Sequence, residues 1–221
     1  MPNFDLVEKA PQVNNYLLVL TMLALTLVAY ARTINPKALS LVWRRFWKLN
    51  RIESFGFDDD KIRPQTQWLL IANFLIALGL STYLFFLDHL IQRSAPLLST
   101  IVVLGYVFFQ MVNYRGALLF ANQWKLVPHL AEVNKQVWSF SGLLLLVLTF
   151  LWVINRSDLT GFYWAYLLIL FGTHLWRWIK AWRTCLQVNL EWYYLILYLC
   201  TLEITPLLFV WRWFAGGTEI N

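Results

Sequence analysis

The chain has 221 residues and a formal net charge of +6, and 59% of its residues are apolar while only 14% are charged. Soluble domains carry roughly 45–50% apolar and roughly 25% charged residues. The composition therefore excludes an ordinary soluble domain and indicates a membrane protein.

Six apolar runs are long enough to cross a hydrocarbon core about 30 Å thick, which takes about 20 helical residues. They cover residues 13–31, 68–91, 97–120, 137–154, 161–181 and 192–214. We therefore predict an all-α polytopic bundle in which the whole chain, 1–221, forms a single transmembrane domain. The start of the chain has no basic region and no small-residue cleavage site, so the first run is expected to be a retained span.

Lys and Arg residues are divided unequally between the two sides of this bundle. Fourteen of the 18 lie in the loops that follow the first, third and fifth spans or near the ends of the third and fifth spans that lead into those loops. Basic loops stay in the cytoplasm, so both termini are predicted to lie outside it. The positive charge then lies where it can meet anionic lipid headgroups, and no nucleic-acid partner is needed to explain it.

The loop after the first span contains the segment NPKALSLVWRRFWKLNRIESF, which predicts an amphipathic helix over residues 37–53. Its apolar face is formed by Leu39, Val42, Trp43, Phe46, Trp47 and Leu49. Its cationic face is formed by Lys37, Arg44, Arg45, Lys48 and Arg51. We expect this helix to lie in the cytoplasmic membrane interface with its cations among lipid phosphates. The alternative is a docking surface for a cytoplasmic partner or a neighbouring subunit.

Two loops contain residue types that bind metal ions in other proteins. The run from Asp58 to Asp60 could chelate a hard cation, but a solvated turn before the second span explains it more simply. His129 and Glu132 share a helical face, as in di-metal bundles, yet such sites need further carboxylates. The sequence also has no phosphate loop, serine-hydrolase elbow or zinc-peptidase motif. We predict no metal, no cofactor and no catalytic residue.

Polar side chains gather in the cytoplasmic half of the predicted spans. At a rise of about 1.5 Å per residue, most lie roughly 8 to 17 Å from the cytoplasmic end of their span. This polar cluster consists of Asn73, Gln110, Asn113, His174, Arg177 and Glu203. Arg177 lies one turn below His174 on the same helical face.

The stretch CTLEITP places an acidic residue and a proline in the middle of the last span. Glu203 costs roughly 2.5–3.5 kcal/mol there, so it should face protein or water and be neutral or paired. Pro206 removes a backbone donor and is predicted to kink the helix. Glu203 is interpreted as a hydrogen-bonding bridge between helices, as a proton or ion site, or as an inter-subunit contact. By depth, His174 or Asn113 is the nearer partner, because about 11 Å separates Glu203 from Arg177.

The segments HLWRWIKAW (174–182) and YLILYLCTLEITPLLF (194–209) resemble the C-terminal signature of an uncharacterised multi-pass inner-membrane family from Bacteroidota. The matching positions are Arg177, Tyr198, Cys200, Glu203 and Pro206. The resemblance implies the inner (cytoplasmic) membrane of a Gram-negative bacterium. The termini, which the basic loops place outside the cytoplasm, would then be periplasmic. The resemblance implies no established reaction.

Three classes of function remain open. We favour a non-enzymatic subunit of an inner-membrane assembly that serves protein export or surface motility, with other membrane subunits as partners. The alternative is a proton-linked carrier of a small solute or lipid that uses Glu203 and His174, although the internal repeats usual in carriers are not evident. The third class, an intramembrane enzyme acting on a lipid or quinone, lacks a recognisable catalytic pair.

Overall fold

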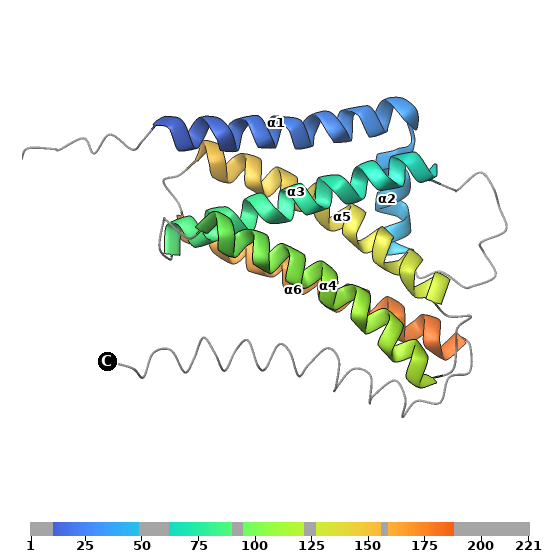
Figure 1. Cartoon of the computed structure of the whole chain (residues 1–221). Helices are drawn as coiled ribbons and strands as arrows, with labels where there is room; N and C mark the ends of the chain where they lie inside the picture. Colours follow the sequence, from blue (N-terminus) through green and yellow to red (C-terminus); the bar gives the residue numbers. More distant parts are fainter. Residues whose placement is uncertain (1–10, 49–61, 90–94, 122–126, 156–158, 188–221) are drawn as a thin grey trace, which may run out of the picture.

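The computed structural model describes residues 11–48, 62–89, 95–121, 127–155 and 159–187, and all structural statements concern these residues (Figure 1). These residues are almost entirely helical and contain no strand, which confirms the all-α part of the predicted fold class. The helices are α1 (Pro11–Ile34), α2 (Ala38–Trp47), α3 (Pro64–His89), α4 (Ala95–Ala121), α5 (Val127–Ile154) and α6 (Leu159–Gln187).

Prolines mark several helix boundaries. α1 ends before Pro36, whose ring disfavours helical geometry at the preceding residue, and the side chain of Asn35 accepts a hydrogen bond from the Lys37 backbone N–H at 3.2 Å. α3 begins with Pro64, and Pro96 and Pro128 are the second residues of α4 and α5. A proline in the first turn costs no intrahelical bond, because the first N–H groups have no helical partner.

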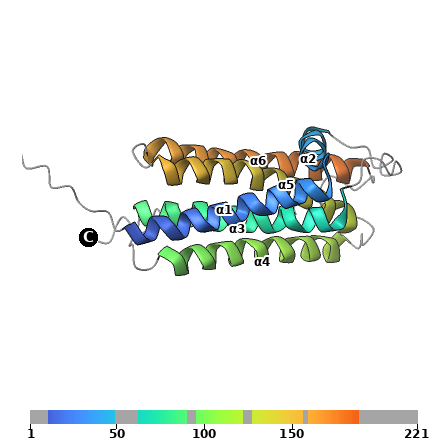
Figure 2. The ribbon, with the colours of Figure 1, turned by 90° about the horizontal axis from the view of Figure 1, so that it is seen from above.

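The long helices run up and down the bundle, and short α2 lies at the end where α1 finishes and α3 starts (Figure 1). Seen from above, α6 and α4 lie on opposite sides of α1 and α3 (Figure 2). α3 packs most extensively on α5 and also contacts α1, α4 and α6. α3 is therefore the central helix of the described bundle.

The observed helices follow the predicted spans, with two differences. α5 begins at Val127 where residue 137 was predicted, and α6 continues to Gln187 where residue 181 was predicted. Both extensions are rich in polar residues. Hydropathy did not include them in the predicted spans, because it detects only the apolar part of a helix. The predicted sixth span, residues 192–214, lies outside the described residues.

Three helices are long and apolar enough to cross a membrane, at Asn15–Ile34, Pro64–Leu87 and Pro128–Ile154. The apolar stretch Ala95–Gln110 of α4 is shorter, and the second half of α6 carries Arg177, Lys180 and Arg183. These helices indicate a membrane protein, whereas six crossings remain a prediction.

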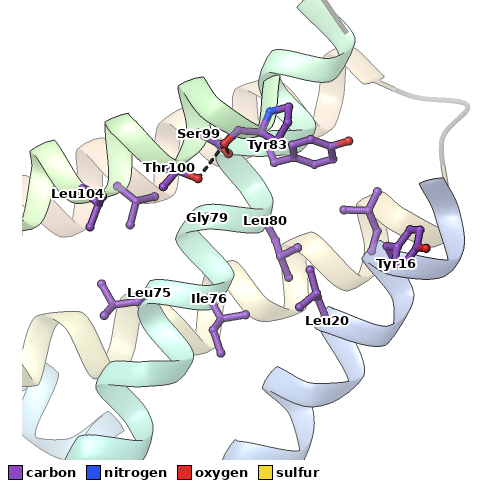
Figure 3. Close-up of a pocket in the computed structure, with 13 residues that line it drawn as sticks. Tyr16, Leu20, Leu75, Ile76, Gly79, Leu80, Tyr83, Ser99, Thr100 and Leu104 are labelled. Atoms are coloured by element: carbon purple, nitrogen blue, oxygen red, sulfur yellow. Dashed lines mark hydrogen bonds between the residues drawn. The ribbon is translucent and has the colours of Figure 1, made fainter. Parts of the chain in front are cut away.

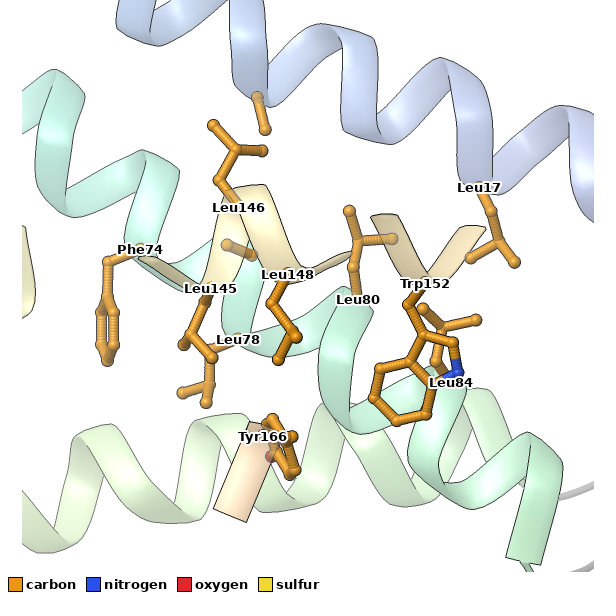
Figure 4. Close-up of a cluster of buried hydrophobic side chains, with 12 residues drawn as sticks. Leu17, Phe74, Leu78, Leu80, Leu84, Leu145, Leu146, Leu148, Trp152 and Tyr166 are labelled. Carbon is orange, nitrogen blue, oxygen red and sulfur yellow. The ribbon is translucent and has the colours of Figure 1, made fainter. Parts of the chain in front are cut away.

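The main core joins α1, α3, α5 and α6 (Figure 4). Leu17 comes from α1, Phe74 and Leu84 from α3, Trp152 from α5 and Tyr166 from α6, and all are buried. Hydroxyl groups add polar contacts between these helices. Ser81 and Thr149 share a hydrogen bond of 2.7 Å, and Thr82 and Tyr166 share one of 2.9 Å. Such contacts join helices in a setting where lipid gives little hydrophobic drive for association.

α3 and α5 approach each other closely at Gly142. A Cβ atom at this position would lie 2.8 Å from both Cα and Cβ of Phe74. One turn earlier on α5, Trp138 stacks on the Phe74 ring with 5.7 Å between centroids. Glycine is therefore needed here so that the backbone of the central helix can pass close to α5.

Candidate functional site

The amphipathic helix α2 packs against the bundle of its own chain. The residues buried on its apolar side are Ala38, Leu41, Val42 and Phe46. The Phe46 ring stacks on Phe140 of α5, with 3.7 Å between centroids and an interplanar angle of 16°. The indole Nε1 of Trp176, on α6, donates a hydrogen bond to the Phe46 carbonyl oxygen at 2.7 Å. α2 is thus held by both α5 and α6.

Because of this packing, only part of the predicted apolar face of α2 is buried, and the rest is exposed. Val42 and Phe46 face the protein, while Trp43 and Trp47 are 58% and 51% exposed. Leu41, which was not assigned to that face, is buried because neighbouring helices contact α2 on two sides. Leu49 lies outside the described residues. The aromatic surface left for lipid or a partner is therefore formed by Trp43 and Trp47.

Arg45, one of the predicted headgroup-binding cations, points to a carboxylate of α5. Its guanidinium lies 3.6 Å from Glu132, and both side chains are mostly shielded. Lys135 lies 3.9 Å from the same carboxylate, and Gln67 of α3 donates to it at 3.5 Å. Glu132 therefore joins α2, α3 and α5 by charge and hydrogen bonding. Arg44 and Lys48 are exposed at the helix surface, and Arg51 lies outside the described residues.

Lys180 links α6 to the end of α2. Its Nζ donates to the Arg45 carbonyl oxygen at 2.5 Å and to Oε1 of Gln136 at 3.3 Å. The same ammonium lies 5.8 Å from the centroid of the Phe46 ring. A cation is favourable here, because the last carbonyls of a helix carry partial negative charge. Lys180 thus stabilises the C-terminal end of α2.

The structure brings together two members of the predicted polar cluster. Nη1 of Arg177, on α6, donates a hydrogen bond to Oε1 of Gln110, on α4. Arg177 is only 4% exposed and Gln110 only 1%. His174 lies one turn from Arg177 and contacts Trp178 edge-on, at 5.1 Å between ring centroids. Polar side chains from two different helices thus meet inside the bundle.

The other members are not joined to this pair by any described contact. Asn73 is fully buried on α3, and its amide atoms have no hydrogen-bond partner among the described residues. Asn113 lies on α4 one turn beyond Gln110, but its side chain is not described. Glu203 and Pro206 lie outside the described residues, so their predicted roles stay predictions.

A cavity of about 320 Å³ lies next to the Arg177 contact, among α3, α4, α5 and α6. Its wall is largely apolar and includes Phe74, Leu78 and Tyr106, while α6 contributes His174 and Arg177. The cavity could take an apolar group with an acidic end, because the basic side chains meet it from one helix. The described part of the chain places no carboxylate or thiol in its lining.

A larger groove of about 540 Å³ lies among α1, α3 and α4 (Figure 3). Tyr16 and Leu20 of α1, Ile76 of α3 and Leu104 of α4 line it. Its two α4 hydroxyls, on Ser99 and Thr100, donate to the carbonyl oxygen of Pro96 at 2.9 and 2.8 Å. Among the described residues, the ionisable groups that line the groove are the phenols of Tyr16 and Tyr83, and the rest of the lining is mostly apolar.

Sequence reasoning missed the contacts made by Glu132, Gln136, Trp176 and Lys180. Glu132 was weighed only as a partner of His129 in a metal site, and Lys180 was counted only for orientation. The sole signal for Lys180 was its place in the basic second half of α6. Its partner is a backbone carbonyl 135 residues away in the chain, and no side-chain pattern reveals such a contact.

Comparison with known proteins assigns the chain to a family. Residues 17–214 match the family described as "Domain of unknown function (DUF4271)". The chain belongs to this family. The match reaches into every predicted span and confirms the expectation of an uncharacterised domain family. The Bacteroidota origin and the C-terminal signature remain predictions. No curated protein and no solved structure matches the chain.

Proposed function

We propose that this member of the DUF4271 family is a non-enzymatic subunit of an inner-membrane assembly. This is supported by the contacts of its polar side chains, which bond to other helices of the same chain. Arg177 with Gln110, Lys180 with Gln136, and Arg45 with Glu132 each join two helices of the bundle. Contacts of this kind fix how helices pack, and they leave the described residues without an acid–base pair directed at a substrate.

The proposed partner surface is the outer face of α2. Trp43 and Trp47 are exposed there beside Arg44 and Lys48. Trp and Arg are enriched in the residues that dominate protein–protein interfaces. Because α2 is anchored to α5 and α6 through Phe46, this surface is presented in a fixed orientation. We further propose that both termini are periplasmic and that the assembly serves protein export or surface motility.

Purification of the tagged protein in mild detergent tests the assembly. We expect other membrane subunits to co-purify in fixed stoichiometry, and the double variant Trp43→Ala/Trp47→Ala to lose them while the protein stays abundant. Trp164→Ala is the matched control, because Trp164 is 63% exposed on α6 and belongs to neither α2 nor its contacts. A purified protein without subunits, carrying a bound small molecule, would contradict the proposal.

The cavity beside Arg177 favours a second candidate, a proton-linked carrier of a small anionic solute or lipid. His174 and Arg177 would bind the acidic group, and the apolar wall would hold the rest of the molecule. Extraction and mass spectrometry of the purified protein would test this. A carrier should retain a stoichiometric acidic ligand that is lost in Arg177→Gln, whereas a subunit without a ligand site should retain none.

A further inference from the structure

The groove among α1, α3 and α4 follows one face of the central helix (Figure 3). α1 and α4 both pack on α3, and residues of all three helices line the groove. The α3 residues in the lining recur at helical spacing and are Leu75, Ile76, Gly79, Leu80 and Tyr83. At about 1.5 Å per residue they cover about 12 Å of α3. The groove therefore extends along the helices, which is the direction of a lipid acyl chain beside a membrane-spanning helix.

Gly79 leaves room in the wall that α3 contributes to this groove. A Cβ atom at this position would lie 3.9 Å from Cγ2 of Val103, which is an ordinary van der Waals contact. Glycine is therefore not needed here for α3 to approach α4. At Gly142, by contrast, a Cβ atom would lie 2.8 Å from Phe74. The absence of a side chain at position 79 thus creates space in the groove, and a larger residue there would fill it.

The phenols of the groove lie at one of its ends. Tyr16 and Tyr83 are found where α1 begins and α3 ends (Figure 3). The candidate spans of these helices start at Asn15 and end at Leu87, so both tyrosines lie within about one turn of the edge of the apolar region. Tyrosine is enriched at this level of membrane proteins, where the headgroup region of the bilayer begins.

The other end of the groove is apolar. Leu75 and Ile76 of α3 and Leu104 of α4 line it, further along the helices from the two phenols (Figure 3). The groove thus combines hydrogen-bond donors near the membrane interface with an apolar wall at greater depth. A phospholipid has the same arrangement, since its ester groups lie at the interface and its acyl chains lie deeper.

We propose that this groove binds one acyl chain of a phospholipid from the leaflet next to the start of α1. The chain lies along Gly79, and the ester carbonyl oxygens accept hydrogen bonds from the hydroxyl groups of Tyr16 and Tyr83. Among the described residues, those that line the groove carry no charged side chain, so the acyl chain and ester are recognised without selection by headgroup charge. The site shares no described lining residue with the cavity beside Arg177 and does not depend on the proposed assembly.

Native mass spectrometry tests the site by counting the phospholipids that bind to the full-length chain. Protein stripped of lipid in detergent is titrated with dioleoylphosphatidylethanolamine. We expect one molecule to bind before all others, and Gly79→Leu to weaken this first binding several-fold because leucine fills the groove. Gly105→Leu is the matched control, since Gly105 is exposed on α4 outside the groove lining and a Cβ there meets nothing within 4 Å. Unchanged binding to Gly79→Leu, or equal weakening in both variants, would overturn the proposal.

A pair of tyrosine substitutions tests the site without changing its shape, and it decides the matter alone if Gly79→Leu does not fold. Tyr16→Phe/Tyr83→Phe removes both hydroxyl donors and should weaken the first binding several-fold. Tyr30→Phe is the control, because Tyr30 is 58% exposed on α1 and does not line the groove. First binding that is the same in the tyrosine pair and in this control would contradict the proposed contact with the ester.

Light scattering of the lipid-free samples distinguishes a lipid site from an interface between two copies of the chain. We expect the wild type and Gly79→Leu to have the same mass. A dimeric wild type and a monomeric Gly79→Leu variant would show that a second copy occupies the groove, and the lipid proposal would be wrong.

Discussion

Lys180 of α6 donates a hydrogen bond to the backbone carbonyl oxygen of Arg45 in α2, over a distance of 2.5 Å. The side chain of Arg45 lies 3.6 Å from Glu132 of α5. The last turn of α2 is therefore bound through its backbone to one helix and through a side chain to another. This double attachment makes α2 part of the bundle.

Lys180→Met is expected to loosen α2 from the bundle. The variant keeps a side chain of similar length but removes the donor to Arg45 and Gln136, leaving acceptors without their partner. Loss of a charged donor to a shielded acceptor costs about 1–3 kcal/mol. Thermal unfolding in detergent should show a lower midpoint. Arg183→Met, at an exposed position of the same helix, should leave the midpoint unchanged, and equal effects would contradict the role of Lys180.

Gly142→Ala is expected to destabilise the contact between α5 and α3. The added methyl group would lie 2.8 Å from Cα and Cβ of Phe74, so the backbone of the central helix must move. Overpacking of this kind costs about 1–3 kcal/mol. Gly172→Ala is the control, because a Cβ there meets nothing within 4 Å. If both variants unfold at the same temperature in the same detergent, the close approach of α3 and α5 is wrong.

The apolar pattern of the sequence was sufficient to predict the helices but not how they meet. Hydropathy gave the centres of α1, α3 and α4, while the polar turns at the start of α5 and the end of α6 were assigned to loops. Those turns carry Glu132, which contacts Arg45 of α2, whereas Phe140, Trp176 and Lys180, which also contact α2, lie inside the predicted spans. A transfer scale measures affinity for lipid, and these residues contact protein.

The sequence indicated how deep the residues of the polar cluster lie in their spans, but it indicated their contacts only in part. Their position in the cytoplasmic half of the predicted spans drew attention to Gln110 and Arg177, which share a hydrogen bond in the structure. Depth does not specify which face of a helix a residue occupies. Asn73 satisfied the same criterion, yet no described residue bonds its amide. Two residues on different helices can touch only if they lie at similar depths and if both helices are rotated so that the two side chains face each other. A single sequence whose spans are weakly amphipathic indicates the depth of a residue but not the rotation of its helix.

Cations in and after α2 are predicted to control attraction to anionic lipid; Arg44 and Lys48 are exposed, and Arg51 lies outside the described residues. We expect the triple variant Arg44→Gln/Lys48→Gln/Arg51→Gln to insert normally but to lose its dependence on anionic lipid, since each cation near the surface contributes about 1 kcal/mol. Thermal stability in vesicles with and without phosphatidylglycerol measures this. Arg45→Gln is the contrasting variant, because its contact with Glu132 predicts lower stability in both kinds of vesicle. Unchanged lipid dependence with loss of a co-purifying subunit would favour the docking role instead.

Reporter fusions test the orientation on which the cytoplasmic position of α2 depends. Fourteen of 18 Lys and Arg residues lie in the loops after the first, third and fifth predicted spans or near the ends of the third and fifth spans that lead into those loops. A fusion between Arg44 and Arg63 should therefore show cytoplasmic activity, and a fusion after Phe214 periplasmic activity. The two fusions together distinguish a wrong orientation of the bundle from a wrong number of spans. If both positions report the opposite side, the bundle is inverted; if Phe214 alone reports the cytoplasm, the predicted number of six spans is wrong.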